Sequence, residues 1–427
     1  MLGSALTSWT PILDGHEAAL AWEAIESLAC ALENPGAFGG AEHALGDGLP
    51  GPALFFAYLA MATGDERARR RSVELIHRAI DRIASDMRDI TLMGGFTGVA
   101  WTVEHLQGRV SEPSEEDLNE QVDEVILDAL ARAPAGAWPS GHELMYGVTG
   151  LGVYALERLP RASAREILDR VVARLDGLAE RNEEGLTWSS RSSRLPENLR
   201  KSFADVYYSL GVAHGPPGVI GFLGMVHAAG IENDRTRSLI LDASRWLLAR
   251  RIPHARGSRF ASFHPRPDET PARSSWCYGN PGIPVCLFIA AHALGDEDLR
   301  AAAHELALET VRRPHEESGV LDPGLCHGAA GLGHLLNRAY QATGDDRFRE
   351  GARFWINYAI GMRRPGEGLA GFLALLSNPG DPEPVYKSDP GFLPGASGIG
   401  LALLASVSHV EPAWDRVLLA SLPPRAD

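Results

Sequence analysis

The sequence predicts an all-α fold, an (α/α)7 toroid in which seven inner helices alternate with seven outer helices. Three observations predict it: a Gly-x-x-Gly turn recurs seven times, an apolar small-residue segment follows each turn, and a charged amphipathic segment precedes most of them. Successive turns begin 47 to 68 residues apart, the spacing of a two-helix repeat with a variable loop. The turns begin at Gly48, Gly95, Gly147, Gly215, Gly279, Gly328 and Gly395.

A ring of repeats also accounts for the length of the chain. A single hydrophobic core ordinarily stops growing well below 427 residues. Stacked repeats avoid this limit because each helix pair buries its apolar face against its neighbours. We therefore expect one domain over residues 1–427, closed by the seven helix pairs.

The charged segments between the turns predict the outer helices. In the second of them Val73, Ile76 and Ile80 mark one face, and arginines and acids occupy the other, which is a helical period. The predicted outer helices cover residues 18–33, 66–87, 115–132, 163–181, 235–251, 297–313 and 346–362.

The segments that follow the turns are rich in Ala, Gly and Leu, as expected of helices buried on both sides. Three of them end in a Gly-Asp pair, at 64–65, 295–296 and 344–345. Glycine can end one helix in the left-handed region and aspartate can cap the next, so these pairs predict tight antiparallel hairpins. No stretch shows convincing strand alternation, although the loops at 185–192 and 263–271 can hold short strands.

Two of the longer spacings contain inserted loops next to the fourth and fifth turns. Residues 182–212 precede the fourth turn and carry Tyr207 and Tyr208, and residues 252–276 precede the fifth turn. Loops at the edge of a rigid scaffold are where substrate contacts concentrate. We expect both loops to cover the mouth of the ring.

Composition excludes several classes of protein. The net charge of −15 argues against a nucleic-acid surface, where basic residues have to neutralise phosphates. Residues 1–10 lack the basic start and apolar run of a secretion signal. The apolar stretches at 283–294 and 392–407 are too short or too rich in glycine to predict a membrane span. We expect a cytoplasmic protein.

The four cysteines are too few for a disulfide framework in a chain of this length. In a reducing compartment cysteines are buried hydrophobes, metal ligands or nucleophiles. Cys30 and Cys286 fall in apolar helices and are expected to pack there. Cys277 and Cys326 differ, because each stands two residues before the first glycine of a turn.

Turns four to six carry His214, Cys277, Cys326 and His327 directly before their glycines. Equivalent positions in a closed ring of repeats lie at the same height along the ring. We therefore expect these side chains to converge at one mouth of the ring. Two thiolates and an imidazole suit zinc, and three protein ligands leave a fourth tetrahedral position for a substrate. From spacing alone, small packed cysteines and a histidine bonded to a carbonyl explain the pattern equally well.

Three sequence blocks bear on this choice between a zinc site and side chains that only pack. Ser-Trp-Cys-Tyr-Gly-Asn-Pro-Gly at 275–282, Leu-Cys-His-Gly-Ala-Ala-Gly at 325–331 and Gly-Val-Ala-His-Gly-Pro-Pro-Gly at 211–218 resemble the signature blocks of the lanthionine synthetase C family, the class I lanthipeptide cyclases. The resemblance covers essentially the whole chain. It implies an α/α-toroid zinc protein that adds peptide cysteine thiols to dehydroalanine or dehydrobutyrine and so forms lanthionine or methyllanthionine rings.

The resemblance also implies roles for single residues. The family's zinc ligands fall on Cys277, Cys326 and His327, which would hold one zinc ion per chain. The acid-base histidine falls on His214, and the tyrosine after the first zinc cysteine is Tyr278.

Two further positions complete the expected site. Arg273 matches an arginine four residues before the first zinc cysteine, where it can stabilise the enolate oxygen or hold a carboxylate. Glu143 stands where the family usually has an aspartate, so the carboxylate is kept but reaches one methylene further. A solvated acid at a turn is the alternative interpretation of Glu143.

Partners follow from the resemblance alone. The substrate would be a dehydrated precursor peptide with a leader and a core, and the loop at 182–212 is our candidate for leader binding. Association with a lanthipeptide dehydratase and an export transporter is also implied, which would place this cytoplasmic chain at the periphery of a membrane-associated complex.

Three other functions stay open. The chain could add glutathione or another free thiol to dehydrated peptides, or serve as a non-catalytic zinc-containing scaffold that binds peptides. An α/α-toroid glycosidase is the third, and it needs two facing carboxylates. The turns of the sequence offer only Asp47 and Glu143 as candidates for this pair, so we rank the glycosidase last.

Overall fold

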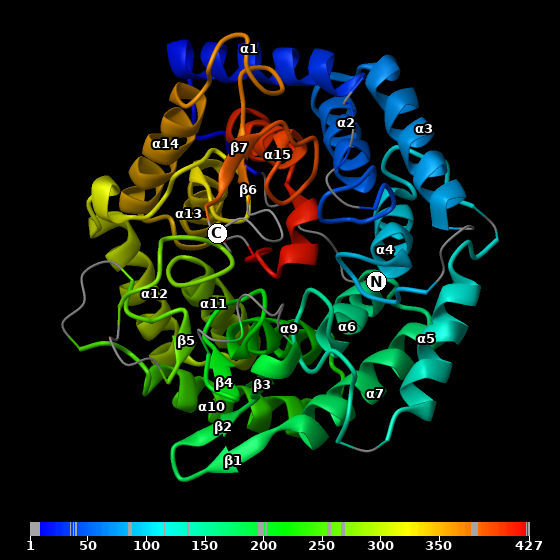
Figure 1. Cartoon of the computed structure of the whole chain (residues 1–427), viewed down its shortest axis with the longest axis vertical. Helices are drawn as coiled ribbons and strands as arrows, with labels where there is room; N and C mark the ends of the chain where they lie inside the picture. Colours follow the sequence, from blue (N-terminus) through cyan, green and yellow to red (C-terminus); the bar gives the residue numbers. More distant parts are fainter. Residues whose placement is uncertain are drawn as a thin grey trace. The chain divides into compact units, whose positions relative to one another are not determined.

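The computed structural model describes residues 9–425, apart from 35, 37, 39–40, 84–87, 115, 135, 195–199, 201–202, 254–257, 266–269, 377–382 and 424. Parts of the inserted loops at 182–212 and 252–276 therefore lie outside the described residues. The described chain is mainly helical (Figure 1), which confirms the all-α prediction.

A helix follows each glycine turn. These inner helices are α2 (Pro50–Thr63), α4 (Phe96–Leu106), α6 (Val148–Glu157), α9 (Pro216–Ala228), α11 (Gly282–Leu294), α13 (Ala329–Thr343) and α15 (Ala396–Val407). Most residues of α2, α9 and α11 are buried on every side, as the small-residue composition predicts.

The outer helices lie between the turns, within a few residues of the predicted ranges. They are α1 (Gly15–Leu32), α3 (Glu66–Ile83), α5 (Glu120–Arg132), α7 (Ala162–Leu178), α10 (Asn233–Leu248), α12 (Glu297–Arg312) and α14 (Asp346–Gly361). In α3 the buried residues form one stripe that includes Ala68, Leu75 and Ala79. Gly64, Gly295 and Gly344 end their helices at φ values of 74°, 64° and 72°, so the predicted left-handed caps are confirmed.

The helices fall into two compact units. The first comprises Met1–Met87, His105–Pro113 and Val320–Asp427, and the second comprises Arg88–Glu104 and Ser114–Gly319. In the first unit α2 packs on α3 and α15, and α13 packs on α14 and α15; in the second α9 lies beside α6, α10 and α11. The expectation of a single domain over the whole chain stays a prediction.

Backbone hydrogen bonds link the turns within each unit. In the first unit Cys326 donates its N–H to the carbonyl of Leu393 (2.8 Å), and Leu393 donates to the carbonyl of Gly46 (2.9 Å). In the second unit Met93 donates to the carbonyl of Met145 (3.1 Å). All five residues stand two places before the first glycine of their turns, so within each unit these positions lie at one level.

The second glycine of a turn is required by close approach. A Cβ atom on Gly331 or Gly398 would overlap the carbonyl oxygen of the residue six places earlier, Leu325 or Phe392. Neither glycine has a positive φ, so the limit is space and not backbone conformation. The backbone of the glycine turn can therefore pack directly against the first turn of the inner helix.

We expect Gly398→Ala to lower the free energy of unfolding by about 1–3 kcal/mol, the usual cost of overpacking a close contact. Urea unfolding followed by circular dichroism measures the loss. Gly361→Ala is the matched control, because a Cβ on Gly361 meets no atom within 4 Å. Equal stability of the two variants would contradict the close-approach argument.

Short strands border the inserted loops. β1 (Glu180–Asn182) pairs with β2 (Gly185–Thr187), and β4 (Val206–Ser209) lies between β3 (Ser190–Arg191) and β5 (Phe263–His264), all antiparallel. A further pair joins β6 (Ala374–Leu376) to β7 (Val385–Lys387). The strands expected near 185–192 and 263–271 are present, whereas β4, which carries Tyr207 and Tyr208, was not predicted. Short 3-10 helices cover Ser192–Arg194, His315–Glu317 and Ala413–Leu418.

Two expectations from the sequence concern burial. Cys286 is buried in α11, and burial raises the pKa of its thiol. Cys30 is exposed on α1, so the prediction that it packs in a core is wrong; it falls on the solvent side of that amphipathic helix.

Across the described residues, no helix combines the length and the apolar character needed to cross a membrane.

Candidate functional site

His214 and Glu143 meet in the second unit. Nδ1 of His214, directly before the α9 turn, lies 2.6 Å from Oε2 of Glu143, which belongs to the α6 turn. The same carboxylate accepts the backbone N–H groups of Met145 (3.2 Å) and Tyr146 (2.5 Å). Glu143 is 8% exposed. Its carboxylate is therefore fixed by its own turn and orients the imidazole.

Opposing effects set the pKa of His214. Burial lowers it, whereas the hydrogen bond and the charge of Glu143, and then the charge of Cys277, raise it. The net result is a pKa above the ordinary value of histidine. Because Nδ1 is bonded to Glu143, Nε2 is the nitrogen left to exchange a proton with a substrate.

Tyr146 extends this pair toward solvent. Its ring stacks on the imidazole of His214 with centroids 6.3 Å apart and an interplanar angle of 22°, and the residue is 47% exposed. Tyr146 was not among the site residues predicted from the sequence. Its place directly before a turn glycine, the same as that of His214, was the signal that could have found it.

Cys277 and Tyr278 lie in the neighbouring turn, before α11. Ser275 holds this turn: its Oγ accepts the N–H of Tyr278 (3.0 Å), donates to the carbonyl of Tyr278 (2.7 Å) and lies 3.5 Å from the sulfur of Cys277. A Cβ on Gly211 would overlap the Cys277 carbonyl and lie 2.6 Å from the Tyr278 ring. The bare glycine thus lets the His214 turn approach the Cys277 turn.

Arg273 begins the Cys277 turn and is exposed. Its backbone packs against Gly319, where an added Cβ would lie 2.8 Å from the Cβ of Arg273. In the described part of the chain, the carboxylate of Glu143 is bound by His214 and by the amides of Met145 and Tyr146. These contacts hold Glu143 without the help expected from Arg273.

Cys326 and His327 belong to the first unit, in the turn before α13. The Cys326 sulfur and a ring nitrogen of His327 lie within 4.8 Å of each other. Nε2 of His327 lies 3.2 Å from Oδ2 of the buried Asp322. The expected ligands are thus divided, with Cys277 in the second unit and the Cys326–His327 pair in the first.

The chemistry of these side chains fits zinc. Two thiolates with one imidazole form a donor set that zinc accepts in tetrahedral geometry. A carboxylate beside the ring of a ligating histidine is the usual companion of such a site. Asp322 has such a carboxylate, and it was not among the site residues predicted from the sequence.

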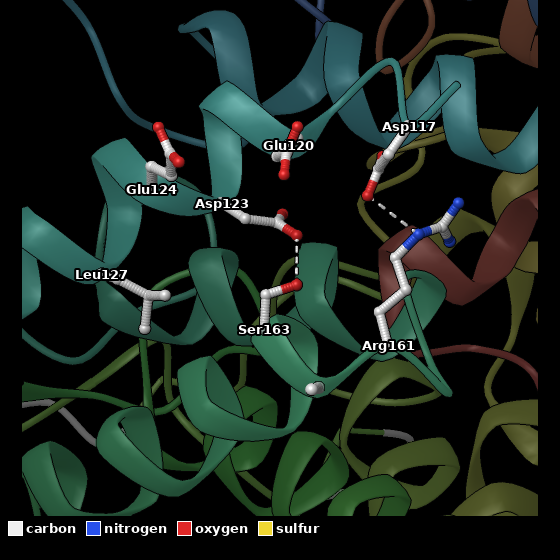
Figure 2. Close-up of a pocket in the computed structure, with 8 residues that line it drawn as sticks. Asp117, Glu120, Asp123, Glu124, Leu127, Arg161 and Ser163 are labelled. Carbon is white, nitrogen blue, oxygen red and sulfur yellow. Dashed lines mark hydrogen bonds and ion pairs between the residues drawn. The ribbon is translucent and has the colours of Figure 1, made fainter.

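A separate acidic cleft of about 400 Å³ lies between α5 and α7 (Figure 2). It is lined by Asp117, Glu120, Asp123, Glu124, Leu127, Arg161, Ala162 and Ser163. Figure 2 shows Ser163 donating to Asp123 (2.6 Å), while Arg161 pairs with Asp117 (3.0 Å).

Arg158 pairs with two of the four acids that line this cleft. Its side chain is 0% exposed and contacts Glu104 (2.8 Å), Asp117 (2.7 Å) and Asp123 (2.6 Å). The hydrogen bond from Arg158 is the main reason why the pKa of Asp117 lies below its usual value. The Asp117 carboxylate is held ionised by the guanidinium, whereas a glycosidase needs one carboxyl group that keeps its proton. We interpret the cluster as structural.

Comparisons with known proteins show the family of this chain. A family model for lanthionine synthetase C-like proteins matches residues 41–419. The protein named glutathione S-transferase LANCL1 from Danio rerio is 25% identical over 356 residues, covering 78% of this chain and 80% of that protein. The nisin biosynthesis protein NisC from Lactococcus lactis subsp. lactis is 22% identical over 374 residues, covering 79% of this chain and 85% of that protein.

A solved structure also matches. The structure titled nisin cyclase superposes with a TM-score of 0.73 at 18% identity, covering 93% of this chain and 97% of that chain. At this identity the likeness shows the fold alone. It confirms the all-α toroid class that the sequence predicts.

Proposed function

Because the chain belongs to the lanthionine synthetase C-like family, we propose that it is a zinc-dependent cyclase. It adds cysteine thiols of a dehydrated peptide to dehydroalanine or dehydrobutyrine and forms lanthionine or methyllanthionine rings. The observation that supports this most directly is the hydrogen bond between the buried Glu143 and the half-buried His214, beside the Cys277 turn. An oriented histidine with a raised pKa is suited to carry the proton that this addition moves.

We assign one zinc ion per chain to Cys277, Cys326 and His327, on the strength of their turn register and donor chemistry. Zinc held there would lower the pKa of a peptide thiol and keep its sulfur as a nucleophilic thiolate. Three protein ligands leave one position for that sulfur.

His214 is the proposed proton carrier. It takes the proton of the peptide thiol on Nε2 while Glu143 balances the imidazolium through Nδ1. The sulfur then bonds to the β-carbon of the dehydro residue, and the electrons of the carbon–carbon double bond move toward the carbonyl oxygen. His214 returns the proton to the α-carbon, so no atom is gained or lost overall.

Arg273 and Tyr278 complete the proposed site. The developing enolate carries negative charge on oxygen, and an exposed guanidinium at the start of the Cys277 turn can stabilise it. The Tyr278 hydroxyl can orient the thiol or the enolate.

A precursor peptide with a leader is the proposed partner, and a dehydratase and an export transporter are further partners that we infer from the family. We propose that the chain forms one domain and is located in the cytoplasm.

A second candidate is the addition of glutathione to a dehydrated peptide. It is favoured by the 25% identity to a protein named as a glutathione S-transferase. Both reactions need an activated thiol and a proton carrier, so the residues above serve either one. They differ in whether the thiol belongs to the peptide.

Mass spectrometry separates the candidates. The purified chain is incubated with a dehydrated, cysteine-containing peptide, with and without glutathione, and the products are treated with an alkylating agent. A cyclase leaves the peptide mass unchanged and protects its thiols from alkylation. An increase by the mass of glutathione supports the second candidate. Peptide that binds but does not react supports the scaffold and contradicts both enzymes.

We expect about one zinc per chain in the parent and far less in Cys326→Ala, because the two remaining ligands would bind the ion weakly. Elemental analysis of both proteins, prepared in parallel, measures the content. Cys30→Ala is the control, since its exposed thiol on α1 is not among the proposed ligands. A folded parent without zinc would contradict the proposed function.

A further inference from the structure

Asp322 is buried in the first unit, six residues before the first glycine of the sixth turn. It is 1% exposed. Its Oδ1 accepts the N–H of Gly324 (3.0 Å), and its Oδ2 accepts the N–H of Leu375 (3.0 Å). The same Oδ2 lies 3.2 Å from Nε2 of His327. Two backbone amides thus fix a carboxylate against the imidazole ring.

The same place in two other turns is also aspartate. Oδ1 of Asp89 accepts the N–H of Thr91 (2.8 Å), and Oδ1 of Asp389 accepts the N–H of Gly391 (2.7 Å). Each of these carboxylates caps its turn, as Asp322 does. Their turns have Gly94 and Pro394 where the sixth turn has His327, so they face no imidazole at that position.

We propose that Asp322 is a positioning residue of the zinc site, which holds Nε2 of His327 and thereby presents Nδ1 to the metal. The inference rests on the proposed function. A carboxylate at the far nitrogen of a ligating histidine fixes the tautomer and the ring orientation, and it makes the ring a better donor. The bonds to Gly324 and Leu375 prevent the carboxylate from turning away, so the ring direction is set before the metal arrives.

Zinc affinity tests the assignment without reference to catalysis. The parent, Asp322→Asn and Asp389→Asn are titrated with zinc against a chromophoric chelator. We expect Asp322→Asn to bind zinc about 10–100 times more weakly, the usual effect of losing such a partner. Asp389→Asn should keep the affinity of the parent, because it removes the same carboxylate charge from a turn that carries none of the proposed ligands. Equal affinity of Asp322→Asn and the parent would overturn the inference.

A double-mutant cycle tests whether the effect passes through His327. In a His327→Ala background, Asp322→Asn should cause no further loss of affinity, and a full additional loss would overturn the assignment. If Asp322→Asn does not fold, Asp322→Ser replaces it, since serine occupies this place in the fourth turn at Ser209. The same loss is expected for that variant.

The outcomes also separate this inference from the proposed function. A folded parent that binds no zinc contradicts the cyclase proposal itself. A parent that binds zinc, with Asp322 variants of unchanged affinity, contradicts the positioning role alone.

Discussion

His214→Ala lowers the rate of thioether formation by about 10²- to 10⁴-fold, the usual contribution of a general acid–base group. Zinc stays bound, because His214 is not among the proposed ligands. The decrease is expected because the variant lacks the group that we propose takes the thiol proton and delivers it to the α-carbon. Single-turnover assays on a dehydrated peptide, followed by thiol alkylation and mass spectrometry, measure the rate.

Two further variants test whether the effect is specific to His214 and its carboxylate partner. His227→Ala removes another histidine from α9, one whose Nδ1 contacts Thr236 (2.9 Å), and should keep the rate of the parent. Glu143→Gln should move the acid limb of the pH–rate profile to lower pH, because the carboxylate raises the pKa of His214. Parental activity of His214→Ala would remove the histidine from the mechanism.

Arg158→Met lowers the free energy of unfolding by about 3–5 kcal/mol, the usual cost of removing one partner from a buried ion cluster. Methionine fills much of the volume but leaves Glu104, Asp117 and Asp123 without their shared cation. Urea unfolding followed by circular dichroism measures the loss. Arg132→Met is the control, because its pair with Asp128 is largely exposed and contributes at most about 0.5 kcal/mol.

The same cluster predicts a dependence on pH. The pKa of Asp117 is lowered in the folded state, so its contribution is present at neutral pH and is lost as the pH falls through that lowered value. In Arg158→Met the decrease in the free energy of unfolding at acid pH should be smaller than in the parent. A stability change below about 1 kcal/mol for Arg158→Met at neutral pH would contradict the buried-cluster argument.

Much of the fold was predictable because its signals are local. The Gly-x-x-Gly turns mark where each inner helix begins, since only glycine fits where the backbone returns against itself. The Gly-Asp pairs mark where three inner helices end, since glycine adopts the required positive φ. The apolar stripe of α3 marks its buried face. Each of these features depends on residues close together in sequence.

The rest depends on contacts between residues far apart in sequence. Asp322 faces His327 because the β6 residue Leu375 fixes its carboxylate, and Arg158 gathers acids from positions 104 to 123. The stacking of Tyr146 on His214 also joins two turns. Turn register identified His214 and the cysteines as candidates, but it did not indicate which neighbour holds each side chain.

The division of the chain into two units bears on how it is made. The second unit lies almost wholly within residues 88–319, so its helix pairs can assemble while the remainder is still being translated. The first unit needs α1 to α3 from the start of the chain and α13 to α15 from its end. α2 and α3 can pack on each other early, but the faces of α1 and α2 that contact α15 stay unpaired until residues 396–407 have been translated. During that interval the nascent chain depends on chaperones more than the finished protein does.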